Sequence, residues 1–343
     1  MALLRGQTQT ALALGALMMW VVGCQGPFPQ STLAPTADFG AHIDDLFRWI
    51  FWFAVAVFVV VEALLVYVLI RYRARPGAPE PERVHGNTLL EIGWTMVPAI
   101  ILILIAAPTI QTIFRTDGTP AEGALEVDVI GHQWWWEYRY PEFGITTANE
   151  LHVQQGRQVS LRLTSQDVIH SFWAPRLGGK RDVIAGRTNR LAFTPDSVGV
   201  FLGQCAEFCG ESHAKMGLRV MVDAPEDFAA WVERERSAPA PAESLSALAR
   251  QGLEAFRLVR EPASNSCIAC HAVQAVSFGV LGPNLSHVGG RTTVGAAALP
   301  NTPAGLAQWL RDPVAVKPGS KMPRIGLTED EITALVAYLQ GLR

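Results

Sequence analysis

The chain has 343 residues, a formal net charge of −3 and a hydrophobic fraction of 49%. This length allows two or three domains, and the high apolar fraction indicates membrane content. The near-neutral charge lacks the basic excess of nucleic-acid-binding proteins, so we expect no nucleic-acid partner. The five cysteines are an odd number, so a simple disulfide framework does not account for them.

Residues 1–23 have the form of a secretory signal, in which Arg5 precedes an apolar run that ends at Gly23. The motif VVGC then resembles the lipobox of bacterial lipoproteins, in which the cysteine becomes the lipidated first residue of the mature chain. We therefore predict an exported bacterial protein with a lipid anchor on Cys24. A cysteine without a role at this position is the alternative.

Two longer apolar stretches, residues 49–70 and 92–114, each exceed the ~20 residues that a helix needs to cross a membrane. They predict a transmembrane hairpin within residues 24–115, in contact with membrane lipid. The loop between the stretches is rich in arginine, which places it in the cytoplasm by the positive-inside rule. A multi-pass protein of the bacterial inner (plasma) membrane follows, with everything after Arg115 on the periplasmic or extracytoplasmic side.

Two carboxylates lie in or beside these stretches. Glu62 falls inside the first, where a charge is costly and normally faces a protein partner or a water path. Glu91 stands at the cytoplasmic start of the second. From the residues alone, Glu91 has either a functional role or the ordinary role of a carboxylate at a helix start.

The sequence pattern of the exported part changes at two points. Short alternating runs up to about Glu235, separated by turn residues, favour a small antiparallel β-sandwich or barrel within residues 116–236. Residues 237–244, SAPAPAES, read as a semi-rigid linker. Residues 245–343 show helical periodicity, and the last helix begins with a capping box from Thr328 to Glu331.

A short stretch of the β domain, GQCAEFCGESHAKM, gathers soft metal ligands at Cys205, Cys209, His213 and Met216. A thiolate, an imidazole and a thioether at this spacing are typical of a copper-binding loop at the rim of a β-sandwich. Such a site needs a second histidine, and His170 in VIHSFW is the natural candidate. Because Cys205 adds a second thiolate that can bridge two metals, the pattern favours a dinuclear copper centre.

Two other readings of this stretch remain open from the residues alone. Cys205 and Cys209 would form a disulfide in an oxidising compartment, or cysteine and histidine would bind zinc in a tetrahedral site. Neither reading uses Met216, and the softness of the ligand set favours copper.

Taken with VIHSFW, GHQWWWEYRY and EIGWTMVPAIILILIA, the segment QCAEFCGESHAKM resembles cytochrome c oxidase subunit II over roughly residues 40–235. The resemblance implies a cupredoxin-like sandwich that holds a dinuclear copper centre, CuA. It also places a magnesium ion at the side chain of Glu207, at the interface with subunit I. Quinol-oxidase relatives have lost the copper ligands, whereas here the family's positions are filled by His170, His213, Cys205, Cys209, Met216 and the carbonyl of Glu207.

The same resemblance assigns roles to two further residues. Trp134 matches the electron-entry tryptophan near CuA, whereas ordinary sandwich core is the other reading of the run Trp134–Trp136. Three consecutive residues of a strand cannot all face one side, so at least one should point outward. Glu91 matches a carboxylate at the entrance of a proton path into subunit I.

The motif CIACH accounts for the last two cysteines. Cys267 and Cys270 would form thioethers to a haem c, and His271 would supply the proximal iron ligand. We expect Met322 as the sixth ligand, with His287 as the competitor, because a Met/His pair raises the potential of an electron donor. KMP resembles the axial loop of class I cytochrome c, and LGPNL resembles the loop on the proximal side of the haem.

The sequence as a whole predicts a multidomain membrane protein with a two-helix hairpin, a cupredoxin-like β-sandwich and an all-α class I cytochrome c domain. We expect the electron-input subunit of a proton-pumping cytochrome c oxidase of the caa type, partnered by subunit I and other subunits. Cytochrome c or another carrier would donate the electrons, and the oxygen-reducing site would lie in another subunit. The alternative is a membrane-anchored electron carrier with CuA and haem c that serves another reductase.

Overall fold

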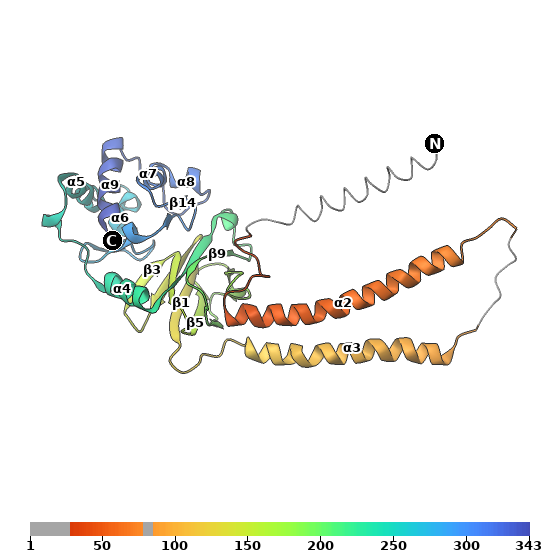
Figure 1. The fold of residues 1–343 in the computed structure, drawn as a ribbon. Helices are drawn as coiled ribbons and strands as arrows, with labels where there is room; N and C mark the ends of the chain where they lie inside the picture. Colours follow the sequence, from red (N-terminus) through yellow and green to blue (C-terminus); the bar gives the residue numbers. More distant parts are fainter. Residues whose placement is uncertain (1–27, 78–84) are drawn as a thin grey trace, which may run out of the picture.

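The computed structural model describes residues 28–77 and 85–343. The predicted signal sequence and Cys24 therefore lie outside the described residues. Figure 1 shows two long helices that leave one side of a β-sandwich, while a helical C-terminal domain packs on another side.

The two long helices are α2 (Asp38–Arg71) and α3 (Thr88–Arg115), of 34 and 28 residues. Both are longer than the apolar stretches that predicted them. α2 begins earlier because its first turns pack on the sandwich, where Phe39 and Asp44 are buried. The side chain of Asn87 caps α3, and the Trp49 indole donates to the Leu104 carbonyl at 3.3 Å across the pair. The most apolar stretch of each helix is 0% buried within the described chain.

The sandwich consists of two five-stranded sheets. The first has the order β3-β2-β1-β5-β8, with β1 (Leu125–His132), β2 (Trp135–Tyr140), β3 (Ile145–Ala148), β5 (Val159–Ser165) and β8 (Asn189–Phe193). The second has the order β4-β10-β9-β6-β7, with β4 (Glu150–Gln154), β6 (His170–Trp173), β7 (Arg181–Val183), β9 (Gly199–Cys205) and β10 (Gly217–Asp223).

The sheets are mixed, whereas the sequence predicted antiparallel ones. β1 pairs in parallel with β5, and β4 pairs in parallel with β10. A parallel pair needs a crossover connection. The chain supplies it because it passes from the first sheet into the second at β4 and then returns to the first at β5. Alternate residues of β1 and β10 fill the core between the sheets, in the expected period of two.

The last part of the predicted β region is helical. α4 (Pro225–Arg236) has Pro225 in its first turn, a position that favours helix initiation. Phe228, Trp231 and Val232 lie on one face of this helix and are buried against the sandwich. The helical spacing of three apolar residues therefore prevails over the strand pattern expected up to Glu235.

The C-terminal domain packs mainly through α5 (Ala247–Arg257) and α9 (Glu329–Gly341). A side chain at Gly252 would collide with the Ala334 carbonyl, so the two helices cross with their backbones close together. Thr328 and Glu331 form the predicted capping box. The remaining elements are α6 (Cys267–Cys270), α7 (Pro303–Arg311), α8 (Pro313–Val316) and the short strands β11 (Ala272–Val273), β12 (Ser277–Phe278), β13 (Thr293–Val294) and β14 (Leu299–Pro300).

Candidate metal and haem sites

The copper-loop candidates lie on the connection between β9 and β10, which we call the copper loop, residues 205–216. Cys205 ends β9, and Met216 directly precedes β10. The two strands are antiparallel neighbours, and the Cys205 amide donates to the Met216 carbonyl at 2.9 Å. The loop therefore folds back on itself, which brings its sulfur and nitrogen donors to one end of the sandwich.

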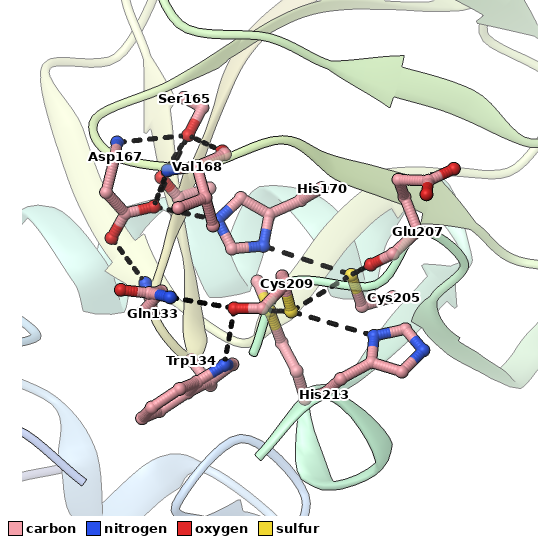
Figure 2. A network of polar contacts seen from close by, with 12 residues as sticks. Gln133, Trp134, Ser165, Asp167, Val168, His170, Cys205, Glu207, Cys209 and His213 are labelled. Atoms are coloured by element: carbon pink, nitrogen blue, oxygen red, sulfur yellow. Dashed lines mark hydrogen bonds and ion pairs between the residues drawn. The ribbon is translucent and has the colours of Figure 1, made fainter. Parts of the chain in front are cut away.

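The sulfur atoms of the loop are in contact but not bonded (Figure 2). The Cys205 and Cys209 Sγ atoms lie 3.7 Å apart, whereas a disulfide bond is about 2.05 Å long. From Cys209 Sγ, His213 Nδ1 lies at 3.6 Å and Met216 Sδ at 3.9 Å. Both cysteines are free thiols and both are buried. The geometry thus does not support the disulfide reading, and Met216 belongs to the cluster.

His170 enters the cluster from the neighbouring strand β6. Phe172 of β6 pairs with Cys205 of β9, and this register places the His170 Nδ1 atom 3.9 Å from Cys205 Sγ. A side chain at Gly131 would collide with the imidazole, so close packing under β1 also fixes the ring. His170, Cys205 and Cys209 have ligand atoms within 4.8 Å of one another.

Asp167 orients His170, a role that the sequence reasoning missed. Its carboxylate lies 2.9 Å from His170 Nε2, so Nε2 carries the proton and Nδ1 faces the sulfurs. Burial raises the pKa of Asp167, but hydrogen bonds from His170, Gln133 and Val168 lower it by more, and the carboxylate stays ionised. An acidic residue three positions before the histidine in DVIH was the available signal.

The two thiols have opposite proton affinities. The pKa of Cys205 is lowered to about 3, chiefly because the Cys209 thiol donates to it. The pKa of Cys209 is raised by the same contact and by burial. One thiolate therefore forms readily, and loss of the second proton needs a bound cation.

The donor set suits copper better than zinc. It comprises two thiols, two imidazoles, one thioether and the carbonyl of Glu207, whose oxygen lies 3.2 Å from Cys205 Sγ. A thioether and paired thiolates are soft ligands that select copper, whereas structural zinc sites use four thiolate or imidazole ligands. The side chain of Glu207 is exposed and turned away from the sulfurs in Figure 2.

The three tryptophans have three different environments. Trp136 is fully buried beside His170, and Trp135 is partly exposed and stacks on His132 at 4.2 Å. Trp134 precedes the strand, and its indole donates to the Cys209 carbonyl at 3.0 Å. Trp134 is only 9% exposed because the C-terminal domain covers it: a side chain at Gly319 would lie 2.8 Å from its ring. The residue that points outward is therefore Trp135.

The CIACH motif forms α6 and the residue that follows it. The His271 Nδ1 atom donates to the Pro283 carbonyl at 2.8 Å, which leaves Nε2 free for a metal. Burial lowers the pKa of His271, so the ring is neutral, as an iron ligand must be. A side chain at Gly282 would collide with the imidazole, so the LGPNL loop lies directly against the ring. These features fit the proximal side of a haem c.

The two candidates for the sixth ligand lie in different surroundings. Met322 is half-buried and packs against the core of the C-terminal domain. His287 is 5% exposed, and neither of its ring nitrogens has a hydrogen-bond partner within the described chain. No hydrogen bond between described residues joins either side chain to His271. The choice of Met322 thus stays a prediction.

The membrane-side candidates lie far from both sites. Glu91 is exposed in the first turn of α3, and Glu62 is exposed midway along α2. The structure therefore brings together the copper-loop residues with His170 and Trp134. Glu91 lies in the first turn of α3, and this end of the helix is remote from the sandwich (Figure 1).

Family models cover three segments of the chain. Residues 30–112 match the transmembrane domain of cytochrome c oxidase subunit II, residues 144–223 match its periplasmic domain, and residues 260–343 match cytochrome c. The matches support a membrane anchor, copper and haem c, and a role in electron input to an oxidoreductase complex of several subunits.

Relatives resemble nearly the whole chain. Cytochrome c oxidase subunit 2 of Alkalihalophilus pseudofirmus is 36% identical, over 97% of this chain and 96% of that protein. The Bacillus subtilis subunit is 35% identical, over 97% of both. A quinol oxidase subunit 2 of Bacillus cereus is 33% identical but covers 65% of this chain. The solved periplasmic domain of subunit II from Bradyrhizobium japonicum is 32% identical over 34% of this chain, with a TM-score of 0.33. The chain belongs to the cytochrome c oxidase subunit 2 family, in the form that carries a C-terminal cytochrome c domain.

Proposed function

We propose that the chain is the electron-input subunit of a proton-pumping terminal cytochrome c oxidase. Electrons would pass from a donor to haem c, then to a dinuclear CuA centre, and then to the oxygen-reducing centre in subunit I. Haem c would be held by Cys267, Cys270, His271 and Met322. CuA would be held by His170, Cys205, Cys209, His213, Met216 and the carbonyl of Glu207.

The position of Trp134 is the observation that carries this proposal. On one side its indole donates to the carbonyl of Cys209, a proposed copper ligand. On the other side its ring lies against Gly319, three residues before Met322. The loop that bears the proposed haem ligand and the loop that binds copper thus meet at one aromatic side chain. This arrangement supports transfer from haem c to CuA within the chain.

When bound, copper and haem supply the one-electron chemistry. The residues of the chain would hold both centres in fixed positions. Asp167 fixes the ring of His170, and the Pro283 carbonyl fixes the ring of His271. Ligands that are held in place before the electron arrives need little rearrangement afterwards.

The membrane part would serve subunit I. We propose that α2 and α3 span the inner membrane with both soluble domains on the periplasmic side, and that Glu62 faces another subunit. We place the domain boundaries after Arg115 and on either side of the linker 237–244. The exposed carboxylate of Glu207 would contribute to a magnesium site at the subunit I interface, and Glu91 would stand at the entrance of a proton path.

Purification of the whole complex tests the function. Two copper atoms and one haem c per chain should co-migrate with a large multi-span subunit, and the complex should consume oxygen. Glu91→Ala should slow oxygen consumption but leave copper, haem c and reduction of CuA by the donor unchanged. A chain that carries both cofactors but associates with no oxygen-reducing subunit would instead be an electron carrier for another reductase. Full turnover in Glu91→Ala would return Glu91 to the role of an ordinary helix-start carboxylate.

A further inference from the structure

A buried carboxylate of the sandwich accepts hydrogen bonds from the cytochrome c domain. Glu150 in β4 is 3% exposed. Its Oε1 atom accepts from the Thr292 amide at 2.9 Å, the Thr292 hydroxyl at 2.6 Å, the Thr293 amide at 2.9 Å and the Thr293 hydroxyl at 3.0 Å. All four donors belong to the other domain, so only the docked arrangement satisfies this carboxylate away from water.

A buried amino group of the cytochrome c domain, that of Lys317, donates a hydrogen bond to the sandwich domain. Lys317 is 3% exposed, and its Nζ atom donates to the Trp134 carbonyl at 2.5 Å and to the Gly295 carbonyl at 2.9 Å. Burial lowers the pKa of Lys317 to about 7, because the ammonium ion loses its water shell. Lys317 precedes Met322 by five residues on the same loop, so it fixes the proposed haem ligand relative to Trp134.

Further hydrogen bonds join the two domains between Glu150 and Lys317. The Gly217 amide donates to the Ala296 carbonyl at 3.1 Å, and the Ser212 hydroxyl donates to the Pro318 carbonyl at 2.5 Å. Near His170, the Lys321 amine lies 3.2 Å from the Asp167 carboxylate. The contact therefore extends from the start of β4 to the copper loop.

The energetic value of such groups lies in specificity rather than in net attraction. A buried carboxylate or amino group regains water when the domains separate, so the net gain from its bonds is small. A displaced pose, however, would leave either group buried without partners, which costs several kcal/mol. Two groups of this kind at separate points strongly disfavour sliding or tilting of one domain on the other.

We propose that Glu150 and Lys317 are positioning residues that lock the cytochrome c domain in one pose over Trp134. This lock makes the chain's own haem domain the donor to the copper loop and keeps other donor proteins off Trp134. The proposal rests on the proposed function. It differs from a simple tether, in which the linker 237–244 raises the local concentration of a haem domain that searches for its docking site.

The experiment uses the whole oxidase complex with Glu150→Gln and Lys317→Met, singly and combined. After rapid photoreduction of haem c, electron transfer to CuA is followed optically in buffers of increasing viscosity. The wild-type rate should not change with viscosity. In the double variant the rate should fall at least about tenfold and become viscosity-dependent, because displaced domains must first find the productive pose.

A gain of function provides the second readout. In the Met322→Ala background, in which the haem is a poor intermediate, a soluble class I cytochrome c should reduce CuA slowly. Adding Glu150→Gln and Lys317→Met should raise this direct rate at least about tenfold, because Trp134 becomes accessible. Damage to the fold would not produce such a gain.

Controls separate the lock from general effects. Glu142→Gln changes a carboxylate of the same domain whose side chain is 46% exposed and pairs with Arg157, so it should leave both rates unchanged. Thr293→Val removes one hydroxyl donor to Glu150 and should slow the transfer from haem c to CuA by a smaller factor. This variant replaces the double variant if the double variant fails to assemble. Copper and haem spectra verify that both centres are present.

Unchanged rates in a double variant with intact spectra would overturn the lock and leave the tether as sufficient. Failure of the proposed function has a different signature, because the wild-type complex itself would then show no transfer from haem c to CuA.

Discussion

The donor atoms of the copper loop lie in mutual contact, whereas the proposed axial residues of the haem come from distant points of the sequence. The Cys209 Sγ atom lies within 3.9 Å of the Cys205 sulfur, His213 Nδ1 and the Met216 sulfur. His271 and Met322 belong to separate segments, and no hydrogen bond between described residues joins them. The polypeptide alone thus brings the proposed copper donors together, whereas His271 and Met322 would be linked through a bound haem.

The reason lies in how each site is supported. The copper loop connects two hydrogen-bonded neighbours, β9 and β10, and its ends are joined by the bond from the Cys205 amide to the Met216 carbonyl. In the haem domain, the Pro283 carbonyl fixes His271, but Met322 lies on the loop that Lys317 attaches to the other domain. This difference in support predicts that a single substitution in the copper loop affects only the copper site. A substitution near the proposed haem ligands should also affect the contact between the two domains.

The largest effect is expected from Cys205→Ser. It removes one of the two proposed bridging thiolates, so the dinuclear mixed-valence signal should disappear and at most one copper should remain. The cupredoxin-like fold should persist, because the buried sheet residues do not depend on the metal. Electron paramagnetic resonance, copper analysis and thermal unfolding measure these outcomes. An unchanged dinuclear spectrum would refute the bridging role.

Met322→Ala should have an intermediate effect. Haem c should stay attached through its two proposed thioethers, but loss of the proposed Met322 ligand should lower its potential, and the physiological donor should reduce it poorly. CuA should still accept electrons from a small dye. Stopped-flow reduction with the donor and with the dye separates the two routes.

His287→Ala is the matched comparison for this variant. It should leave the haem potential near that of the wild type, because we expect Met322 and not His287 to be the sixth ligand. If His287→Ala abolishes the high potential and Met322→Ala does not, the two assignments must be exchanged. Wild-type reduction of CuA by the donor in Met322→Ala would mean that haem c is off the main path.

The smallest effect concerns the pH dependence of domain docking. Burial lowers the pKa of Lys317 from 10.5 to about 7, so the docked chain binds fewer protons than the separated domains between these values. Docking should therefore strengthen as pH rises through this window and weaken as pH falls towards 7, by up to about 1.4 kcal/mol per pH unit. Below pH 7 the contribution of Lys317 should be constant.

Hydrogen exchange of the segment around Trp134 measures this docking, with Lys317→Met at each pH as the reference for the intrinsic exchange rate. The wild type should gain protection relative to the variant between pH 7 and pH 9. A difference between the two proteins that does not vary over this range would show that the Lys317 amine is not linked to docking.

Local sequence patterns determined much of this molecule. Apolar length predicted the two long helices, although α2 extends to Asp38 because its first turns pack on the sandwich. The capping box at Thr328 fixed the start of α9. The copper-loop residues were found because five of the six proposed donors lie within one connection, where spacing along the chain reflects spacing in the fold. Such signals are readable because each depends on neighbours in the sequence.

Only the tertiary structure decided which surfaces meet. Trp134 matched an electron-entry residue, yet the fold covers it with the chain's own cytochrome c domain. Glu150 and Lys317 carry no motif, because their partners in the other domain are more than a hundred residues away in the sequence. The parallel pairing of β1 with β5 was also not predictable from the sequence pattern. A periodic pattern records which face of an element is apolar, whereas the pose of one domain on another depends on shape and on buried polar groups that must find partners.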